Sequence, residues 1–143
     1  MRNIINFLLI IIFLILSCIH FYWSTGGSIG YASSLPADEN GNVLLAPGII
    51  DCIIVAIILL VFAFVYIFTL DHRKPKIFNY LIIFGQWVIP MLFLIRAIGD
   101  FKYVGFFKQV TTTEFAYMDT YYFTPLCLLI SCLGIIILYK RLH

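Results

Sequence analysis

The chain has 143 residues, of which 63% are hydrophobic and 11% are charged. A soluble domain is about a quarter charged, and a soluble fold of this length could not bury so much apolar surface. The composition therefore indicates a membrane protein, and a formal net charge of only +2 without a basic, aromatic-rich run argues against nucleic-acid binding.

Four apolar segments are each long enough to cross a bilayer, which takes roughly 17–25 helical residues. They cover residues 4–23, 49–70, 77–98 and 123–139. Short connections make consecutive helices antiparallel neighbours. The predicted fold is therefore all-α, a transmembrane four-helix bundle that forms a single membrane domain over residues 1–143.

Cationic residues set the expected orientation. Arg2 precedes the first segment, DHRKPK (71–76) joins the second to the third, and KRLH (140–143) follows the fourth. Because positive residues favour the cytoplasmic side, we expect a multi-pass protein of the cell membrane with both termini in the cytoplasm. The 24–48 and 99–122 loops would then face outward.

The two outer loops differ in character. The first, residues 24–48, contains STGGSIGYASSL, which we expect to fold back over the mouth of the bundle because glycines allow close approach. The second, residues 99–122, is rich in aromatic residues, as is typical of a segment at headgroup level.

Polar residues follow one stripe of each of three helices, which predicts the faces that point into the bundle. These residues are Asn6, Ser17, His20 and Ser24 on the first helix, Asn79, Gln86 and Asp100 on the third, and Thr124 and Ser131 on the fourth.

Ionisable residues from different helices fall in one shallow layer near the outer interface, and this layer predicts an outward-facing polar pocket. The candidate ligand-binding residues are His20, Trp23, Asp51, Arg96, Asp100 and Asp119. Arg96 would hold an anionic group. His20 is expected within hydrogen-bond reach, directly or through one water, of a carboxylate or of polar groups linked to Arg96 on another helix.

Each of these residues also has a structural explanation. Arg96 can extend to the headgroups, or pair with Asp100 four residues later. Asp51 can stabilise the start of its own helix through the helix dipole. His20 can donate one hydrogen bond as a neutral imidazole.

The cysteines predict neither a disulfide framework nor a metal site. Cys18, Cys52, Cys127 and Cys132 all lie in apolar segments and form no CxxC pair. ILSC (15–18) loosely resembles a lipoprotein cleavage box, but the apolar run continues past it and spans a membrane. No phosphate-binding loop or hydrolase motif is present, and the residues identify no cofactor and leave the oligomeric state open.

Four stretches carry a family resemblance: HFYWSTGGSIGYASSLP, APGIIDCIIVAIILL, RAIGDFKYVGFFK and FAYMDTYYFTPLCLL. They resemble an uncharacterised family of small bacterial four-helix integral membrane proteins with a domain of unknown function. The resemblance covers nearly the whole chain. It implies bacterial origin and the four-helix fold, and it implies no activity.

Three functions fit these observations. The first is binding of a small amphiphile or lipid headgroup in the outward-facing pocket of a protein embedded in the lipid bilayer. The second is a membrane-embedded enzyme with His20 as general acid or base, oriented by Asp51 or Asp119. The third is an accessory or immunity-type membrane protein that acts through helix contacts without a ligand.

Overall fold

The computed structural model describes residues 2–70 and 75–142, and its long elements are all helices. They are α1 (Arg2–Ser24), α2 (Ile49–Leu70), α3 (Lys76–Ile98) and α5 (Thr124–Leu142), with a short α4 (Glu114–Met118) joined to α5 by a π-helical turn, Asp119–Phe123. One further turn, η1, covers Ala32–Ser34. Four stretches of the described chain are long and apolar enough to span a membrane, which confirms the all-α, four-helix prediction.

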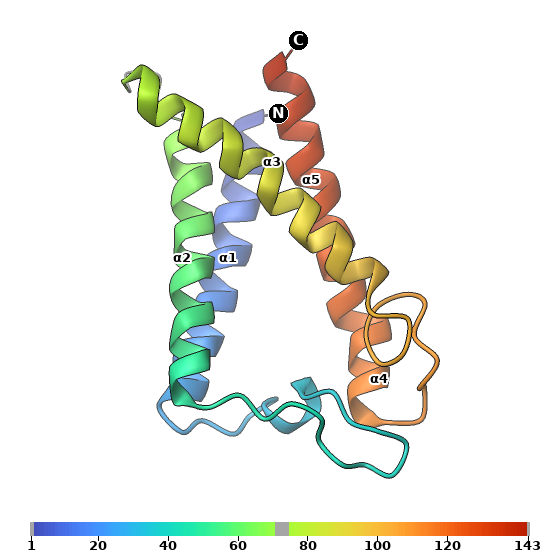
Figure 1. Cartoon of the computed structure of the whole chain (residues 1–143). Coiled ribbons are helices and arrows are strands. Elements are labelled where there is room, and N and C mark those ends of the chain that lie inside the picture. The colour runs from blue at the N-terminus through green and yellow to red at the C-terminus, as the bar shows by residue number, and fades with distance from the viewer. Residues whose placement is uncertain (1, 71–74, 143) are drawn as a thin grey trace.

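The helices form two antiparallel pairs (Figure 1). α1 packs along α2 and α3 packs along α5, while contacts between the two pairs are fewer. The pairs lie close together at the end that holds both termini and spread apart toward the opposite, loop end (Figure 1). The bundle is therefore closed at one end and open between the pairs at the other.

Phe13 lies where the two pairs meet. Its side chain is fully buried, and its ring stacks on Tyr66 of α2 with the ring centroids 5.8 Å apart. The same ring lies 5.6 Å from the ring of Phe93 on α3. Because one side chain of α1 packs on both α2 and α3, Phe13 ties the first helix pair to the second.

The predicted inward stripes are confirmed in part: His20, Ser24 and Asn79 are half-buried, and Asp100, which was also predicted on the inner face of the third helix, is exposed. Asn6, Ser17, Gln86, Thr124 and Ser131 are all buried. The hydroxyl of Ser17 donates to the carbonyl oxygen of Ala56 on α2 at 2.9 Å. Polar side chains thus link helices across apolar interfaces, as is usual within membranes.

A second polar link lies at the termini end. Arg141 of α5 donates to the side-chain oxygens of Gln86 and Asn79 on α3, at 2.6 and 2.5 Å. Gln86 in turn donates to the hydroxyl of Thr69 on α2 at 2.8 Å. This chain of hydrogen bonds connects three helices where the bundle is closed.

The last membrane helix begins earlier than expected. The apolar run predicts a helix over residues 123–139, whereas helical structure begins at Glu114 and passes through the π-helical turn into α5. Thr113 caps this start, since its side-chain oxygen accepts from the backbone N–H of Ala116 at 3.1 Å. The second loop is correspondingly shorter than the predicted 99–122.

The 24–48 segment crosses the loop end from the first helix pair toward α4 (Figure 1), and η1 contacts α4. Two hydrogen bonds hold it: the Trp23 indole donates to the carbonyl oxygen of Ile29 at 2.9 Å, and the Tyr31 hydroxyl donates to that of Pro47 at 2.5 Å. The segment therefore folds over the mouth of the bundle, as the glycine-rich sequence predicts.

Candidate functional site

A buried carboxylate at the loop end of the second helix pair organises a cluster of charges. Asp119 begins the π-helical turn, and its side chain is 0% exposed. Arg96, in the last turn of α3, places Nη2 2.8 Å from Asp119 Oδ1. Lys108 places Nζ 3.2 Å from Asp119 Oδ2. The three residues come from α3, the following loop and the helix that follows the loop.

The carboxylate accepts two further hydrogen bonds at Oδ2. The backbone N–H of Gly105 donates at 2.8 Å and the hydroxyl of Thr124 donates at 3.3 Å. Both oxygens of Asp119 are therefore engaged. Such a set of donors is what a buried carboxylate needs to remain ionised in an apolar environment.

The loop after α3 brings Gly105 and Lys108 to this carboxylate. Gly99 ends the helix with a φ of +87°, and a Cβ atom there would lie 1.7 Å from the carbonyl oxygen of Val104. Only glycine allows the loop to return so closely. The N–H of Phe106 then donates to the carbonyl oxygen of Ala97 at 2.7 Å, which closes the loop.

Asp100 holds the same loop from inside. Its Oδ1 accepts from the backbone N–H groups of Lys102, Tyr103 and Val104 at 2.9, 2.7 and 2.9 Å. Partial burial acts to raise the pKa of this carboxyl, but the backbone hydrogen bonds outweigh it and keep the pKa below its ordinary value. Asp100 is thus a structural residue of the loop and does not pair with Arg96.

The cluster carries an excess of positive charge. Arg96 and Lys108 contribute two positive charges and Asp119 one negative charge, which leaves a formal charge of +1. Lys108 is 4% exposed and Arg96 is 35% exposed in its side chain. The second terminal nitrogen of Arg96, Nη1, is buried and has no hydrogen-bond partner among the described residues. The cluster therefore combines a net positive charge with one guanidinium nitrogen that has no partner among the described residues.

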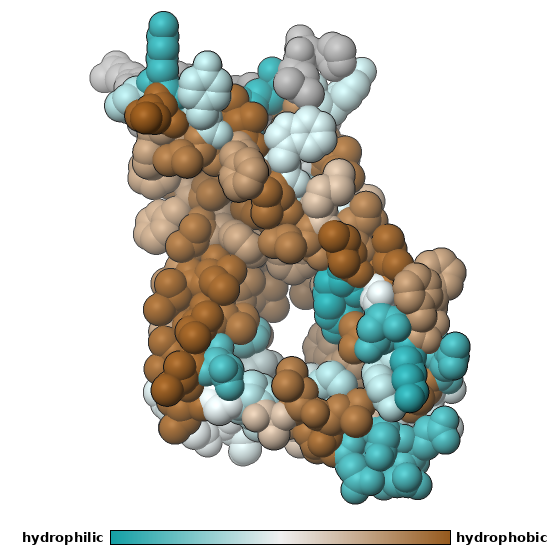
Figure 2. Space-filling view, in the orientation of Figure 1, coloured by the Kyte–Doolittle hydropathy of each residue, from teal (hydrophilic) through white to brown (hydrophobic). Residues whose placement is uncertain are grey.

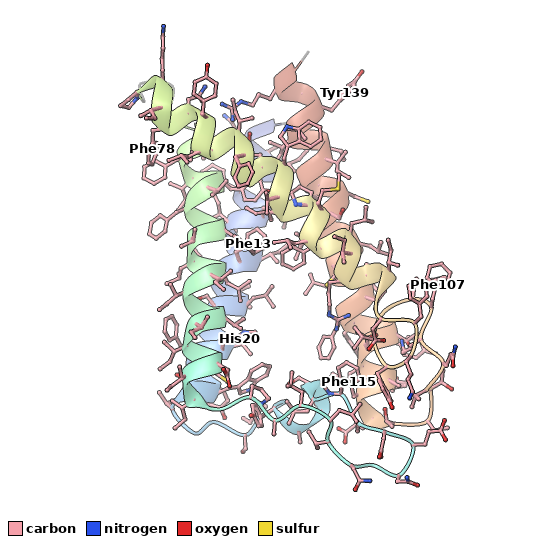
Figure 3. The ribbon with its side chains drawn as sticks, in the orientation of Figure 1. Phe13, His20, Phe78, Phe107, Phe115 and Tyr139 are labelled. Carbon is pink, nitrogen blue, oxygen red and sulfur yellow. The ribbon has the colours of Figure 1, made fainter. Side chains whose placement is uncertain are left out.

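An opening separates the two helix pairs in the loop half of the molecule. Figure 2 shows it in the space-filling view, bounded below by the 24–48 segment. In Figure 3, Phe13 lies at its closed end and His20 lies on the side of α1 and α2. The loop-side half of α3, which carries Arg96, borders the opposite side (Figure 1).

The hydrogen bond recorded for His20 among the described residues is to backbone, not to a carboxylate. Its Nδ1 donates to the carbonyl oxygen of Leu16, one turn earlier in its own helix, at 2.8 Å. Its ring packs against Trp23 with centroids 5.0 Å apart, and Trp23 packs against Tyr31 at 5.7 Å. His20 and Trp23 therefore form an aromatic corner that supports the 24–48 segment.

Asp51 also serves its own helix. Its Oδ2 accepts from the backbone N–H of Gly48 at 2.8 Å, immediately before α2 begins. An acidic residue in the first turn that reaches back to this N–H group is one half of a capping box. The structural explanation considered for Asp51 is the one observed.

The predicted site residues thus divide into three groups. Arg96 and Asp119 form an ion pair, and Asp100 supports the adjoining loop. His20 and Trp23 contact each other on α1. Asp51 caps α2. Sequence reasoning missed Lys108 and Gly105 as partners of Asp119. The signal that could have found them is the GDFKYVGFFK stretch, in which two glycines bracket a turn that returns to the end of its helix.

Among the residues that the structure describes, no three His, Cys, Asp or Glu side chains gather closely enough to hold a metal ion. The four cysteines are free. Cys18 and Cys132 are exposed on the helix surfaces, and Cys52 and Cys127 are buried.

Four helices able to span a membrane and a buried charge cluster at one end define a multi-pass integral membrane protein. A family model described as "Protein of unknown function (DUF3995)" matches residues 13–134, and the chain belongs to this family. This match confirms the resemblance to an uncharacterised four-helix membrane family. Comparisons with curated proteins and with solved structures found no match.

Proposed function

We propose that the protein binds an amphiphile with an anionic headgroup, and that Arg96 contacts the headgroup while the apolar tail enters the opening between the helix pairs. The observation that carries this proposal is the net charge of +1 at Arg96, Lys108 and Asp119, together with the partnerless Nη1 of Arg96. The two positive charges of Arg96 and Lys108 exceed the one negative charge of Asp119, and an anionic oxygen beside the Arg96 guanidinium would balance the excess.

The position of Arg96 favours an amphiphile over a soluble anion. Arg96 lies in the last turn of a helix whose neighbouring side chains, Leu92 and Ile95, are exposed and apolar. A ligand that reaches Arg96 through the opening therefore meets apolar helix surface and a cation within a few residues. A phosphate or carboxylate headgroup joined to a hydrocarbon chain matches both.

The headgroup site would lie on the outer face of the cell membrane. Both termini lie at one end of the bundle (Figure 1). α3 begins with Lys76 at that end and has Arg96 in its last turn, while the last turn of α5 contains Lys140 and Arg141. Since positive residues favour the cytoplasm, the termini end is proposed to be cytoplasmic.

In a cysteine-free background, Asn40→Cys should react with an impermeant thiol reagent in whole cells and Lys76→Cys should not; the reverse pattern would refute this orientation.

Native mass spectrometry of the protein extracted with its lipids tests the binding proposal. We expect the wild-type protein to retain an anionic amphiphile and Arg96→Gln to lose it at least tenfold. Lys102→Gln is the matched control, because it removes an exposed cation from the loop that follows α3. The Nζ atom of Lys102 lies over the Tyr103 ring, 5.0 Å from its centroid, and not in the charge cluster.

Equal retention by Arg96→Gln and wild type would refute the role of Arg96. If neither protein retains any amphiphile, the binding proposal fails and the accessory function becomes the better explanation. No contact of His20 favours the enzymatic alternative, since its hydrogen bond is to its own helix.

A further inference from the structure

A second group of polar atoms lies deep in the bundle, away from Asp119. Tyr66 of α2 and Ser131 of α5 are 0% and 1% exposed. The hydroxyl oxygen of each is buried and has no hydrogen-bond partner among the described residues. In a membrane, a buried hydroxyl without a partner is expensive, because no bulk water is available to it.

These hydroxyls lie close to the point where three helices cross. A Cβ atom placed on Gly134 of α5 would be 3.0 Å from the Tyr66 hydroxyl oxygen and 2.4 Å from Cγ of Pro90 on α3. Gly134 is therefore the small residue that lets Tyr66 and Pro90 approach α5 together. Ser131 precedes Gly134 by three residues, and residues at this spacing have Cβ atoms about 5–6 Å apart on one helix face.

Pro90 also frees a backbone acceptor in α3. Proline has no backbone N–H, so it cannot donate to the carbonyl oxygen of Gln86 one turn earlier in α3. Within membrane helices such freed carbonyl oxygens are satisfied by neighbouring side chains or by ordered water. The Tyr66 hydroxyl and the Pro90 ring both lie against Gly134, and Ser131 is one turn before Gly134 on α5.

We propose that this crossing holds internal water, hydrogen-bonded to the Tyr66 hydroxyl, the Ser131 hydroxyl and the Gln86 carbonyl oxygen. A buried water commonly makes about three hydrogen bonds to otherwise unsatisfied groups, which matches the three polar atoms gathered here. A hydroxyl can also both donate and accept, so water joins these atoms without any charged partner.

The proposed water site is separated from the loop-end opening by a single aromatic layer. Phe13 lies at the closed end of that opening (Figure 3), and its ring stacks on the ring of Tyr66. Asn6 lies two turns from Phe13 on the same buried face of α1, and neither its side-chain oxygen nor its nitrogen has a partner among the described residues. Unsatisfied polar groups therefore continue from the crossing toward the termini end.

Thermal unfolding in lipid nanodiscs tests the proposal through the sign of the effect. Tyr66→Phe removes only the hydroxyl and keeps the stacked ring, and Ser131→Ala removes only the other hydroxyl. If water bridges the two, each change breaks the network and lowers Tm by roughly 2–5 °C, and the double variant loses less than the sum of the single losses. Ser17→Ala, whose hydroxyl has a protein partner at 2.9 Å, is the control and should add independently to either change.

Dry, separate hydroxyls would give the opposite result, because removing an unsatisfied buried group stabilises a protein. An unchanged or higher Tm for Tyr66→Phe, or strict additivity of the two changes, would overturn the proposal. An experimental structure that resolves water offers an independent test: we expect density about 3 Å from both hydroxyl oxygens, and its absence would also overturn the proposal. Neither test depends on amphiphile binding at Arg96.

Discussion

Replacing Asp119 by asparagine should be among the most damaging isosteric changes in this protein. The substitution keeps the size of the side chain and removes its charge. Lys108, at 4% exposed, would then be a buried cation without a counter-charge, and Arg96 would lose its ion pair. The amide nitrogen of asparagine would also face one of the groups that now donate to the carboxylate.

The expected cost follows from the burial of the partners. Breaking a buried ion pair by removing one member costs about 3–5 kcal/mol of unfolding free energy. The Lys108 contact carries most of this cost, because Arg96 is 35% exposed and its pairing is partly screened. We therefore expect Asp119→Asn to lower the unfolding free energy by about 3–5 kcal/mol.

Asp51→Asn is the matched control. Asp51 is exposed and accepts one hydrogen bond, from the N–H of Gly48, so the same chemical change should cost under about 1 kcal/mol. Reversible unfolding in mixed micelles with increasing SDS measures both variants. If Asp119→Asn costs no more than Asp51→Asn, the reasoning about the charge cluster is wrong.

Two further predictions concern the loop after α3. Gly99→Ala should lower the unfolding free energy by more than about 3 kcal/mol, because its Cβ would lie 1.7 Å from the carbonyl oxygen of Val104. Gly41→Ala is the control: Gly41 has a similar φ of +82° and no atom within 4 Å, so the change should cost only the roughly 1–2 kcal/mol of left-handed backbone. Equal losses of the two variants in SDS unfolding would contradict the close approach. The loop hydrogen bonds lower the pKa of Asp100 in the folded protein. The ionised carboxylate therefore stabilises the loop fully when the pH is above the pKa of the unfolded state, about 3.9, and this stabilisation is lost as the pH falls through the lower pKa of the folded state. After correction for intrinsic exchange rates, the Val104 amide of the wild type should therefore lose protection from hydrogen exchange below about pH 4. The protection in Asp100→Asn should not change over this range. Protection that is independent of pH in the wild type would contradict this prediction.

The membrane helices could be predicted because hydropathy and length determine them almost alone. The structure has helices over Ile49–Leu70 and Lys76–Ile98, close to the predicted 49–70 and 77–98. The start of the last helix could not be predicted in this way. Glu114–Phe123 mixes polar and aromatic residues, and its helical start depends on the cap at Thr113.

The charge cluster was only partly accessible from the sequence. Depth along each helix places Arg96 and Asp119 in one layer, but depth does not say which partner each residue takes. Arg96 pairs with Asp119 at a distance of 23 residues in the chain, while the nearer Asp100 turns toward its own loop. Lys108 was missed because its position depends on the contact between Gly99 and the 104–105 backbone. The two glycines of GDFKYVGFFK indicate a turn, but they do not say which carboxylate Lys108 meets.

His20 and Asp51 show that depth in the membrane alone does not identify the residues of a shared site. Both are ionisable residues at the predicted depth, and both make local contacts, with Leu16 and Gly48 respectively. A layer of ionisable residues is therefore a weak guide when backbone groups close in sequence serve as their partners. The buried polar stripe was a stronger guide, since Ser17, Gln86 and Ser131 have no helix end to satisfy them and are buried as predicted.

The pairing of the helices has a consequence for how the protein is made. α1 pairs with α2 and α3 pairs with α5, so each pair is a hairpin of successive membrane helices. The first hairpin holds its own hydrogen bond, from Ser17 to Ala56, and can insert and associate while the rest of the chain is still on the ribosome. The second hairpin contains Arg96, Lys108 and Asp119, so the charge cluster assembles without help from the first. The chain is thus organised as two hairpins that meet around Phe13, and we expect co-expression of the halves as separate polypeptides to reconstitute the whole.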